Sequence, residues 1–349
     1  MPALWNLPDF DAHEGVHFFT DARSGLRAVI AVHSTHLGPA AGGTRFWHYA
    51  DDADAVTDAL RLSRGMSFKN AMAGLPMGGG KGVILAGPER AKSPELLAAF
   101  GRAVDSLGGR YVTAEDVGMG EADLVAIGNE TRYVCGLPVG EGAAGGDPGP
   151  YTAMGVFLGV KAAIKHALGK DSADGVHVAV QGVGSVGGGL ARLLAAEGAR
   201  LTLADVDAAR AEALAGELGA ATVPADRIVG VEADVLSPCA LGAILTEQSI
   251  AALKVKAVAG GANNQLATPD DGARLHARGI LYAPDYVINA GGIINVALEY
   301  LGQGDRAEVE SRLHQIPVRL ESIWAESEKT GETEAAVADR MAMALIGRA

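Results

Sequence analysis

Cysteines and long apolar runs are scarce in this chain, and each scarcity excludes a class of protein. The two cysteines, Cys135 and Cys239, are far apart and form no CxxC spacing. A disulfide framework and a zinc ribbon are therefore excluded, and isolated thiols are typical of a reducing compartment. No run of about 18 uncharged apolar residues is present to span a membrane, and residues 1–11 lack the basic and apolar regions of a signal peptide. We expect a cytoplasmic protein.

Basic residues are also in the minority, with 29 Lys and Arg against 42 Asp and Glu and a formal net charge of −13. Phosphate backbones and anionic lipids repel such a chain, so neither nucleic acid nor a membrane is expected as a partner. The nine histidines are scattered, and no cluster with cysteines or carboxylates predicts a metal site. A length of 349 residues with 48% hydrophobic residues fits two domains with full cores.

The first part of the chain mixes strand and helix patterns with a glycine-rich segment. Ser93 followed by proline is typical of a helix start. The run of glycine and proline at 140–150 predicts a linker and a domain boundary. The expected elements are strands at 16–20, 26–33 and 83–85, helices at 51–65, 94–108 and 151–168, a turn at 22–25 and a glycine-rich segment at 74–82.

From Val176 onward, short apolar strands alternate with helices. This alternation predicts an α/β fold in which a parallel sheet has helices on both faces. We expect a first domain at 1–148, a second domain at 149–325 and a C-terminal helix at 326–349. The expected strands are 176–181, 201–205, 235–236, 257–259 and 281–282, with helices at 187–197 and 208–218.

A GxGxxG sequence lies between one of these strands and the following helix. The pattern alone is weak, but its position between a strand and a helix is that of a Rossmann dinucleotide-binding turn. The first glycine permits the tight turn, the second lets the backbone approach a pyrophosphate, and the third lets the helix pack on the strand. The predicted cofactor contacts are Gly182, Val183, Gly184, Ser185, Val186, Gly187 and Gly188.

Asp205 ends the next expected strand, 18 residues after Gly187. A carboxylate at this place accepts hydrogen bonds from the adenosine ribose and repels a 2′-phosphate, which favours NAD over NADP. The alternative is that Asp205 is an ordinary turn residue, because Asp207 is also near.

Lys69, Lys81 and Asp116 are the candidate reacting groups. Glycines on both sides of Lys81 leave room for a ligand, and a bend between the two lysines could aim both at one point. A lysine titrates near pH 10.4, but burial and a second ammonium can lower its pKa to about 7–8, where it can act as a base. Such a set could bind a carboxylate, activate water and shuttle a proton. The alternative is that both lysines are solvated surface residues.

The sequence resembles the glutamate, leucine, phenylalanine and valine dehydrogenase family over nearly its whole length to about residue 300. Several of the matching strings are long and specific. They are GPAAGGTR at 38–45, RLSRGM at 61–66 continuing to Lys69, GGGKG at 78–82, TAEDVG at 113–118, QGVGSVG at 181–187, SPCALGA at 237–243, GGANNQL at 260–266 and YAPDYVINAGGIINV at 282–296.

This resemblance implies NAD-dependent oxidative deamination of an L-amino acid in a homo-oligomer without a metal. It also implies a substrate-binding and oligomerisation domain at 1–148, an NAD-binding Rossmann domain at 149–325, a cleft between them, and a C-terminal helix that packs back on the first domain. Lys69 would bind the substrate carboxylate, Lys81 would act as a general base through water, and Asp116 would exchange a proton with the amino group or ammonia. The remaining implied contacts are Gly42 and Gly43 for the substrate backbone, Ala41, Ala114, Ile293 and Val296 for its side chain, Asn263 for substrate and nicotinamide, Thr152 for nicotinamide, and Cys239 and Ala240 for adenosine. Cys239 is equally well read as a small buried apolar residue.

The expected substrates are leucine, valine and isoleucine. The short chain and the lack of an evident extra cation argue against a second substrate carboxylate. Ala41 is smaller than the leucine usual in leucine enzymes, so phenylalanine remains an alternative, because one methylene changes specificity by only roughly 1–3 kcal/mol. Two other classes stay open: an inactive NAD-binding sensor, and a 2-hydroxy-acid dehydrogenase, which would place a histidine as base.

Overall fold

The computed structural model describes residues 4–7, 9–138, 144–240, 242–302 and 304–348. The chain forms two compact units, each assembled from separate segments. Unit 1 contains Met1–Gly146, Ile293–Val309 and Ala342–Ala349, and unit 2 contains Asp147–Gly292 and Glu310–Met341. This division differs from the expected domains, because residues 293–309 belong to unit 1 and the C-terminal helix is shared between the units. Residues 140–143 of the expected linker lie outside the described residues.

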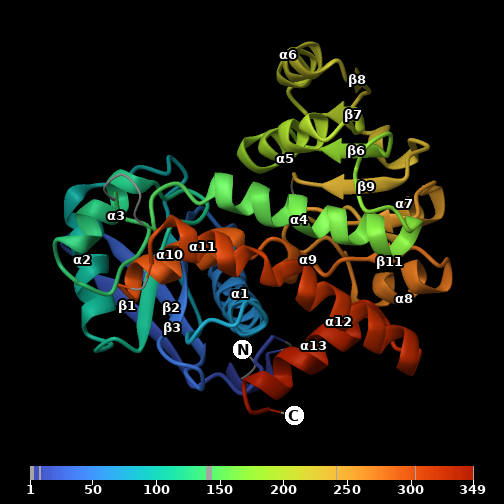
Figure 1. The fold of residues 1–349 in the computed structure, drawn as a ribbon. Helices are drawn as coiled ribbons and strands as arrows, with labels where there is room; N and C mark the ends of the chain where they lie inside the picture. The colour runs from blue at the N-terminus through green and yellow to red at the C-terminus, as the bar shows by residue number, and fades with distance from the viewer. Residues whose placement is uncertain (1–3, 8, 139–143, 241, 303, 349) are drawn as a thin grey trace. The chain divides into compact units, whose positions relative to one another are not determined.

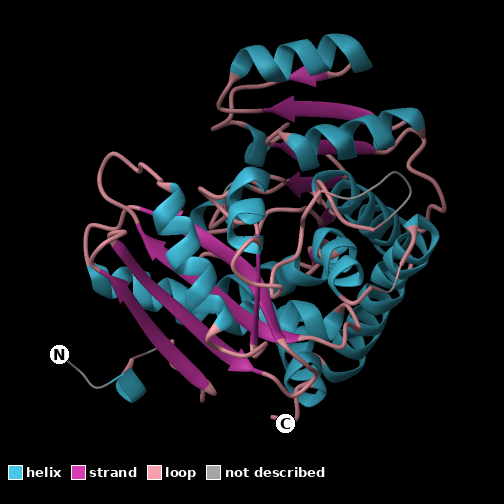
Figure 2. Cartoon of the chain, turned by 90° about the vertical axis from the view of Figure 1, so that its left-hand side faces the viewer, coloured by secondary structure: helices cyan, strands magenta, loops and turns pink. Residues whose placement is uncertain are grey.

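The sheet of unit 1 has the strand order β1-β2-β4-β3-β5 (Figure 2). The expected hairpin is confirmed, because β1 and β2 pair antiparallel. β4 pairs antiparallel with β2 and parallel with β3, which in turn pairs parallel with β5, so the carboxyl ends of β3, β4 and β5 share one edge of the sheet. The strands are β1 (Gly15–Asp21), β2 (Leu26–Ser34), β3 (Ala40–Trp47), β4 (Gly78–Leu85) and β5 (Tyr111–Ala114).

Helices cover both faces of this sheet. Successive side chains of β2 point to opposite faces, and both sets are apolar, so each face forms a core with helices. Ile30 points into the core shared with α2 (Pro94–Asp105) and α3 (Glu121–Gly128), whereas Val29 points into the core shared with α1 (Asp52–Met72). The Ser93 hydroxyl caps α2 as expected, accepting the Leu96 N–H at 3.1 Å. Unit 1 is therefore a three-layer α/β structure.

Helix α1 is longer than expected and carries Lys69 in its last turn. The sequence interpretation ended this helix at Gly65, as glycine often follows a helix C-terminus. A methyl group at Gly65 would meet nothing within 4 Å, and the glycine stays inside the helix. The chain turns instead at Gly74, which has a φ of +68°.

The glycines before Lys81 belong to strand β4 rather than to a loop, which corrects the expectation for 74–82. Each is needed where another element approaches closely. A Cβ at Gly79 would lie 2.0 Å from the Ser67 backbone nitrogen on α1, and one at Gly80 would lie 2.6 Å from the Tyr111 ring. The glycines therefore let α1 and β5 pack against β4.

Unit 2 contains a fully parallel sheet in the order β11-β10-β9-β6-β7-β8 (Figure 1). Numbered from β6, this is the Rossmann order 3-2-1-4-5-6, which confirms the expected fold class. The strands are β6 (His177–Gln181), β7 (Arg200–Ala204), β8 (Ala221–Thr222), β9 (Val235–Pro238), β10 (Ala257–Val258) and β11 (Leu281–Tyr282).

The helices of unit 2 connect and cover these strands. Of these, α5 (Ser185–Ala196) joins β6 to β7, and α6 (Ala208–Leu218) joins β7 to β8 (Figure 1). The others are α4 (Gly149–Leu168), α7 (Glu247–Ala252), α8 (Pro269–Ala277), α9 (Asp285–Ile288) and α12 (Gln315–Thr330). Three further helices, α10 (Gly291–Tyr300), α11 (Arg306–Leu313) and α13 (Glu334–Leu345), lie at or near the points where the chain passes between units. In the part of the chain that is described, no helix is long and apolar enough to cross a membrane.

Candidate active site

Lys81 and Asp116 meet at the edge of the first sheet. Lys81 lies on β4, Asp116 follows β5 by two residues, and the Lys81 Nζ is 2.8 Å from the Asp116 Oδ2. The Lys81 side chain is 6% exposed and that of Asp116 23% exposed. The parallel strands β3, β4 and β5 bring these groups together, and neither is a solvated surface residue.

Burial and charge act against each other at this pair. Burial lowers the pKa of Lys81, and the Asp116 carboxylate opposes this change, leaving the pKa below its ordinary value. Burial favours the neutral form of Asp116, but the charges of Lys81 and Arg45 outweigh it and lower the pKa of Asp116. The site thus combines a stable carboxylate with an ammonium that loses its proton more readily than a free lysine.

Arg45 and Asp58 belong to the same site and were missed as functional residues by the sequence analysis. The Arg45 Nε donates to the Asp116 Oδ2 at 3.0 Å, and its Nη1 donates to the Asp58 Oδ2 at 2.8 Å. Arg45 lies on β3 and Asp58 on α1, so their contact depends on the packing of this helix against the sheet. The available signal was an arginine inside the otherwise apolar and small-residue strand AAGGTRFW.

Lys69 is half-buried in the last turn of α1. Close packing of Ser67 against Gly79 brings the end of this helix to β4, the strand that carries Lys81. The chain between them turns at Gly74, so the expected bend is present, formed by a helix end and a strand start. This places the two lysines on neighbouring elements of unit 1.

The predicted substrate-side residues of β3 lie beside those of β5. Gly42 pairs with Thr113, and Gly43 pairs with Ala114. A Cβ at Gly43 would lie 2.9 Å from the Asp116 Cβ, and one at Gly42 would lie 1.9 Å from the Gly80 carbonyl oxygen. Both glycines therefore have a packing role in bringing the strands together, whatever their contact with substrate. Ala41 and Ala114 are buried.

The GxGxxG turn of unit 2 has the geometry that a pyrophosphate requires. Gly182 follows β6 with a φ of +84°, and a Cβ at Gly187 would lie 1.9 Å from the Gly182 carbonyl oxygen. A Cβ at Gly184 would meet nothing within 4 Å, and no side chain caps the N-terminus of α5. Free N–H groups and open space at a helix N-terminus fit a dinucleotide phosphate. Val183, Ser185, Val186 and Gly188 complete this turn.

Asp205 follows β7 and supports the glycine turn. Its Oδ2 accepts the Val183 N–H at 2.8 Å, and its Oδ1 accepts the Asp207 N–H at 2.9 Å. Burial raises the pKa of Asp205, but these N–H groups and the charge of Arg210 outweigh it and lower the pKa. Asp207 instead caps α6 by accepting the Arg210 N–H. Asp205 thus makes the contact of a turn residue, as the alternative expects, Asp207 is the helix cap, and the ribose role of Asp205 stays a prediction.

Other predicted contacts lie around the same turn or on α10. A Cβ placed at Gly182 would lie 2.7 Å from the Ala240 Cβ. A Cβ placed at Gly187 would lie 2.9 Å from the Cys239 Cβ. The Asn263 Oδ1 accepts the Asn289 Nδ2–H at 2.7 Å. Thr152 is near the start of α4, where its hydroxyl donates to the Pro148 carbonyl. Ile293 and Val296 belong to α10 and to unit 1.

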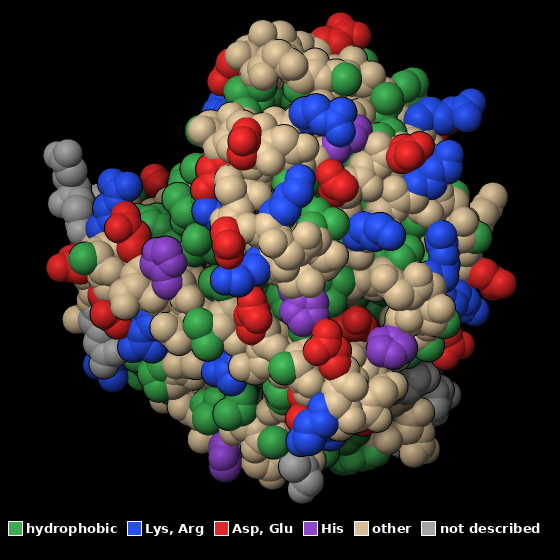
Figure 3. Space-filling view, turned by 45° about the vertical axis from the view of Figure 1, so that its right-hand side comes forward, with side chains coloured by type: hydrophobic (Ala, Val, Ile, Leu, Met, Phe, Trp, Pro, Cys, Tyr) green, Lys and Arg blue, Asp and Glu red, His purple; other side chains and the backbone are tan. Residues whose placement is uncertain are grey.

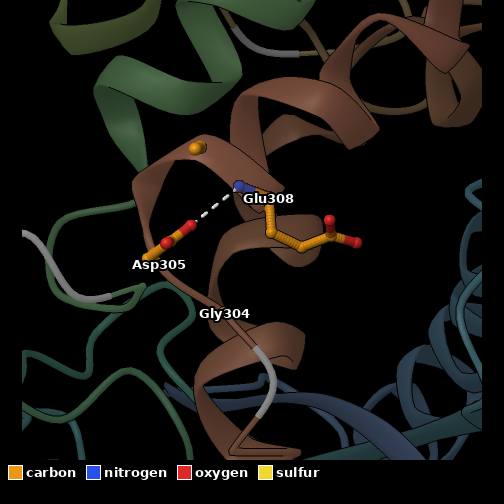
Figure 4. A pocket seen from close by; sticks show the side chains of 4 residues that line it. Gly304, Asp305 and Glu308 are labelled. Atoms are coloured by element: carbon orange, nitrogen blue, oxygen red, sulfur yellow. Dashed lines mark hydrogen bonds between the residues drawn. The ribbon is translucent and has the colours of Figure 1, made fainter.

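A separate shallow hollow lies at the start of α11 and contains none of the predicted site residues (Figure 4). Asp305 accepts the Glu308 N–H at 3.0 Å there, the contact of a helix N-cap. Capping accounts for the acid at this place. Within the described ranges, no cluster of three or more His, Cys, Asp or Glu side chains could hold a metal ion.

A Rossmann unit joined to a unit with a buried lysine–carboxylate site defines a dinucleotide-dependent dehydrogenase. Residues 13–133 match the Glu/Leu/Phe/Val dehydrogenase dimerisation domain, and residues 203–348 match the Glutamate/Leucine/Phenylalanine/Valine dehydrogenase domain. The chain belongs to this family of NAD(P)-dependent amino-acid dehydrogenases, and the expected resemblance is confirmed.

Curated relatives and solved structures agree with this assignment. The chain is 48% identical over 330 residues to leucine dehydrogenase of Geobacillus stearothermophilus, covering 95% of this chain and 89% of that protein. It is 47% identical over 339 residues to valine dehydrogenase of Streptomyces coelicolor, covering 96% and 92%. The structure of L-tryptophan dehydrogenase from Nostoc punctiforme matches with a TM-score of 0.84 and 42% identity, covering 96% of both chains.

Proposed function

We propose that this enzyme oxidatively deaminates branched-chain L-amino acids with NAD, giving the 2-oxo acid, ammonia and NADH reversibly. The buried contact of Lys81 with Asp116 carries the proposal, because it supplies a lysine of lowered pKa beside a charged carboxylate. The leucine and valine dehydrogenases, at 46–48% identity, support the choice of substrate.

The proposed reaction divides the work among three residues of unit 1. Lys69 binds the substrate carboxylate. The glycine turn at 182–187 would hold NAD, which would supply the hydride acceptor for oxidation of the substrate amine to an imine. Neutral Lys81 takes a proton from a water that attacks the imine carbon, and Asp116 exchanges a proton with the substrate nitrogen before ammonia leaves. Because Lys81 must lose its proton, deamination is expected to quicken as pH rises through the pKa of Lys81.

The cofactor preference is proposed from Asp205. A carboxylate held by two backbone N–H groups at the end of β7 stays charged and repels a 2′-phosphate. NAD is therefore expected to be preferred over NADP.

A second substrate class is favoured by two observations. Ala41 and Ala114 are small and buried, and the similar solved structure of 42% identity is a tryptophan dehydrogenase. Phenylalanine or another aromatic amino acid is therefore the alternative to the branched-chain substrates.

One absorbance screen tests the proposal. NADH formation is measured with leucine, valine, isoleucine, phenylalanine and glutamate, each with NAD and NADP, and the reverse reaction is measured with and without ammonium. Leucine, valine or isoleucine should give the highest kcat/KM. Reduction of a 2-oxo acid without ammonium would contradict the mechanism, and NAD binding without turnover of any amino acid would indicate a sensor.

Lys81→Ala tests the base assignment. Turnover should fall by about 10²–10⁴-fold, the usual contribution of a positioned acid or base. The NAD dissociation constant, measured by fluorescence or calorimetry, should stay nearly unchanged because the glycine turn is in unit 2. Turnover like that of the wild type would refute the assignment.

We also infer that the enzyme is a homo-oligomer. The family model matched at 13–133 is described as a dimerisation domain, which supports this inference.

A further inference from the structure

Asp116 has two cations on a single oxygen. The Lys81 Nζ and the Arg45 Nε lie 2.8 and 3.0 Å from the Asp116 Oδ2. The hydrogen bond and ion pairs seen on this side chain all go to Oδ2. The carboxylate is thus oriented by contacts made to one of its two oxygens.

Arg45 is itself fixed by a second carboxylate. Its Nη1 donates to the Asp58 Oδ2 at 2.8 Å, so the guanidinium bridges Asp58 and Asp116 with different nitrogens. A planar guanidinium bound at two places has little freedom to turn, whereas a single ammonium would rotate. The Arg45 side chain is 22% exposed and that of Asp58 16%, so water screens the bridge only partly.

Asp58 has its own donors on both oxygens. The Tyr49 hydroxyl donates to Oδ2 at 2.8 Å, and the Arg61 Nη2 donates to Oδ1 at 3.0 Å. Burial, and then the Asp58 carboxylate, raise the pKa of Tyr49, so this hydroxyl remains a donor. The chain of contacts therefore runs from α1 through Arg45 on β3 to Asp116 after β5.

We propose that Arg45, fixed by Asp58, is a positioning residue for the reaction, holding Asp116 by Oδ2 so that Oδ1 faces the substrate nitrogen. The inference deepens the proposed function and rests on the roles given there to Lys81 and Asp116. Arg45 contacts no reacting atom and acts through the carboxylate that it orients.

The same contacts predict that neutralising Arg45 and neutralising Asp58 shift the pKa of Lys81 in opposite directions. The charged groups facing Lys81 are Asp116 after β5, Arg45 on β3 and Asp58 on α1. Burial lowers the pKa of Lys81, the Arg45 charge lowers it further, and the two carboxylates raise it. Neutralising Arg45 should therefore raise the pKa of Lys81, and neutralising Asp58 should lower it.

The test compares Arg45→Gln, Arg45→Lys and Asp58→Asn with the wild type in profiles of kcat/KM against pH for deamination. Substrate ionisation is common to all the proteins, so a difference in the rising limb belongs to the enzyme. Arg45→Gln should move this limb to higher pH and lower kcat by about tenfold or more, since misplaced reacting groups lose rates of up to about a hundredfold. Asp58→Asn should move the limb to lower pH.

Arg45→Lys keeps the positive charge but loses the two-nitrogen contact that joins Asp58 to Asp116. It should restore the position of the rising limb without restoring kcat. The matched control is Arg102→Gln, which removes the same charge from a side chain that is 52% exposed on α2. This control should behave like the wild type, and the NADH dissociation constant should be the same in all variants.

Two results would overturn the inference. The first is an Arg45→Gln enzyme whose rising limb and kcat, within twofold, match the wild type. The second is loss of activity in step with lower thermal stability, without opposite movements of the limb in Arg45→Gln and Asp58→Asn. Failure of the proposed function is separate: it would appear as full activity in Lys81→Ala and Asp116→Asn, whatever the Arg45 variants do.

Discussion

At the scale of single residues, the space around each glycine decides which glycines the fold requires. Gly79 lies where α1 meets β4, and a Cβ there would be 2.0 Å from the Ser67 nitrogen and 2.3 Å from its hydroxyl. Gly65 lies in the same helix with nothing within 4 Å of a Cβ. The two positions form a matched pair for substitution by alanine.

Gly79→Ala should lower the thermal stability strongly, because backbone rather than a flexible side chain must move. Gly65→Ala should raise the stability by up to about 1 kcal/mol, since alanine is the better helix former. Denaturant unfolding followed by circular dichroism measures both. A Gly79→Ala protein as stable as the wild type would show that α1 does not pack against β4 at this contact.

Asp205 offers a second residue-scale prediction, because one carboxylate supports the turn and is proposed to bind the ribose. Asp205→Ala should weaken NAD binding and reduce the discrimination against NADP. Asp207→Ala, which removes only a helix cap, should leave the NAD/NADP ratio of kcat/KM unchanged. An unchanged ratio in Asp205→Ala would move the discriminating role to another residue.

At the scale of elements, the C-terminal residues after α13 bind the N-terminal part of unit 1. The Arg348 guanidinium donates to the carbonyl oxygens of Asp11, Ala12 and His33. It also lies 2.7 Å from the His33 Nε2. The same nitrogen lies 3.2 Å from the Asp11 Oδ2, and the His33 Nδ1 lies 2.7 Å from the Ser67 hydroxyl oxygen. The last residues of the chain thereby fix a buried histidine beside α1.

Arg348→Ala should destabilise the protein by about 1–3 kcal/mol at pH 7, because partly buried carbonyl oxygens lose their donor. Burial and then the Arg348 charge lower the pKa of His33 to about 3, against an ordinary value of 6.5. The folded protein therefore keeps His33 neutral where the unfolded chain would protonate it. The contribution of His33 to the free energy of unfolding is complete above pH 6.5 and is lost as pH falls toward 3. Removing Arg348 should make this loss shallower. Unfolding free energies measured at several pH values check both parts, and an unchanged slope would contradict them.

Elements also show what the sequence predicts and what it does not. The alternation after Val176 predicted the parallel sheet of unit 2 because each strand and helix there has a local pattern with clear breaks. Only residues 83–85 of strand β4 were predicted as strand, because the glycines before them are explained only by neighbours distant in sequence, Ser67 and Tyr111. Arg45 and Asp58 were missed for the same reason, since a strand and a helix must pack before the two charges meet.

At the scale of the whole molecule, surface charge and the exposed edge strand of the first sheet are relevant to how subunits associate. On the face shown in Figure 3, basic and acidic side chains are interspersed. Strand β1 is an edge of the first sheet within the described residues, and Phe18 on it is 61% exposed. An exposed edge strand with an aromatic side chain pairs readily with another chain. We expect β1 to take part in the proposed homo-oligomer.

Phe18→Asp should therefore reduce the mass of the assembly in light scattering or native mass spectrometry. Val318→Asp makes the same apolar-to-acidic change at a 56% exposed position on α12, outside residues 13–133, and should leave the mass unchanged. Equal masses for the wild type and Phe18→Asp would place the subunit contact elsewhere.

The division of the chain has a consequence for its synthesis. The polypeptide passes between the two units four times, at 146/147, 292/293, 309/310 and 341/342. Unit 1 receives the segment Ala342–Ala349, with Arg348, only after unit 2 has received all of its own segments. A nascent chain ending near residue 341 would hold every segment of unit 2 while unit 1 still lacked its final one. On the ribosome, the segments of the Rossmann unit are thus all synthesised before the segment Ala342–Ala349 of unit 1, although residues 1–146 of unit 1 precede them in the chain.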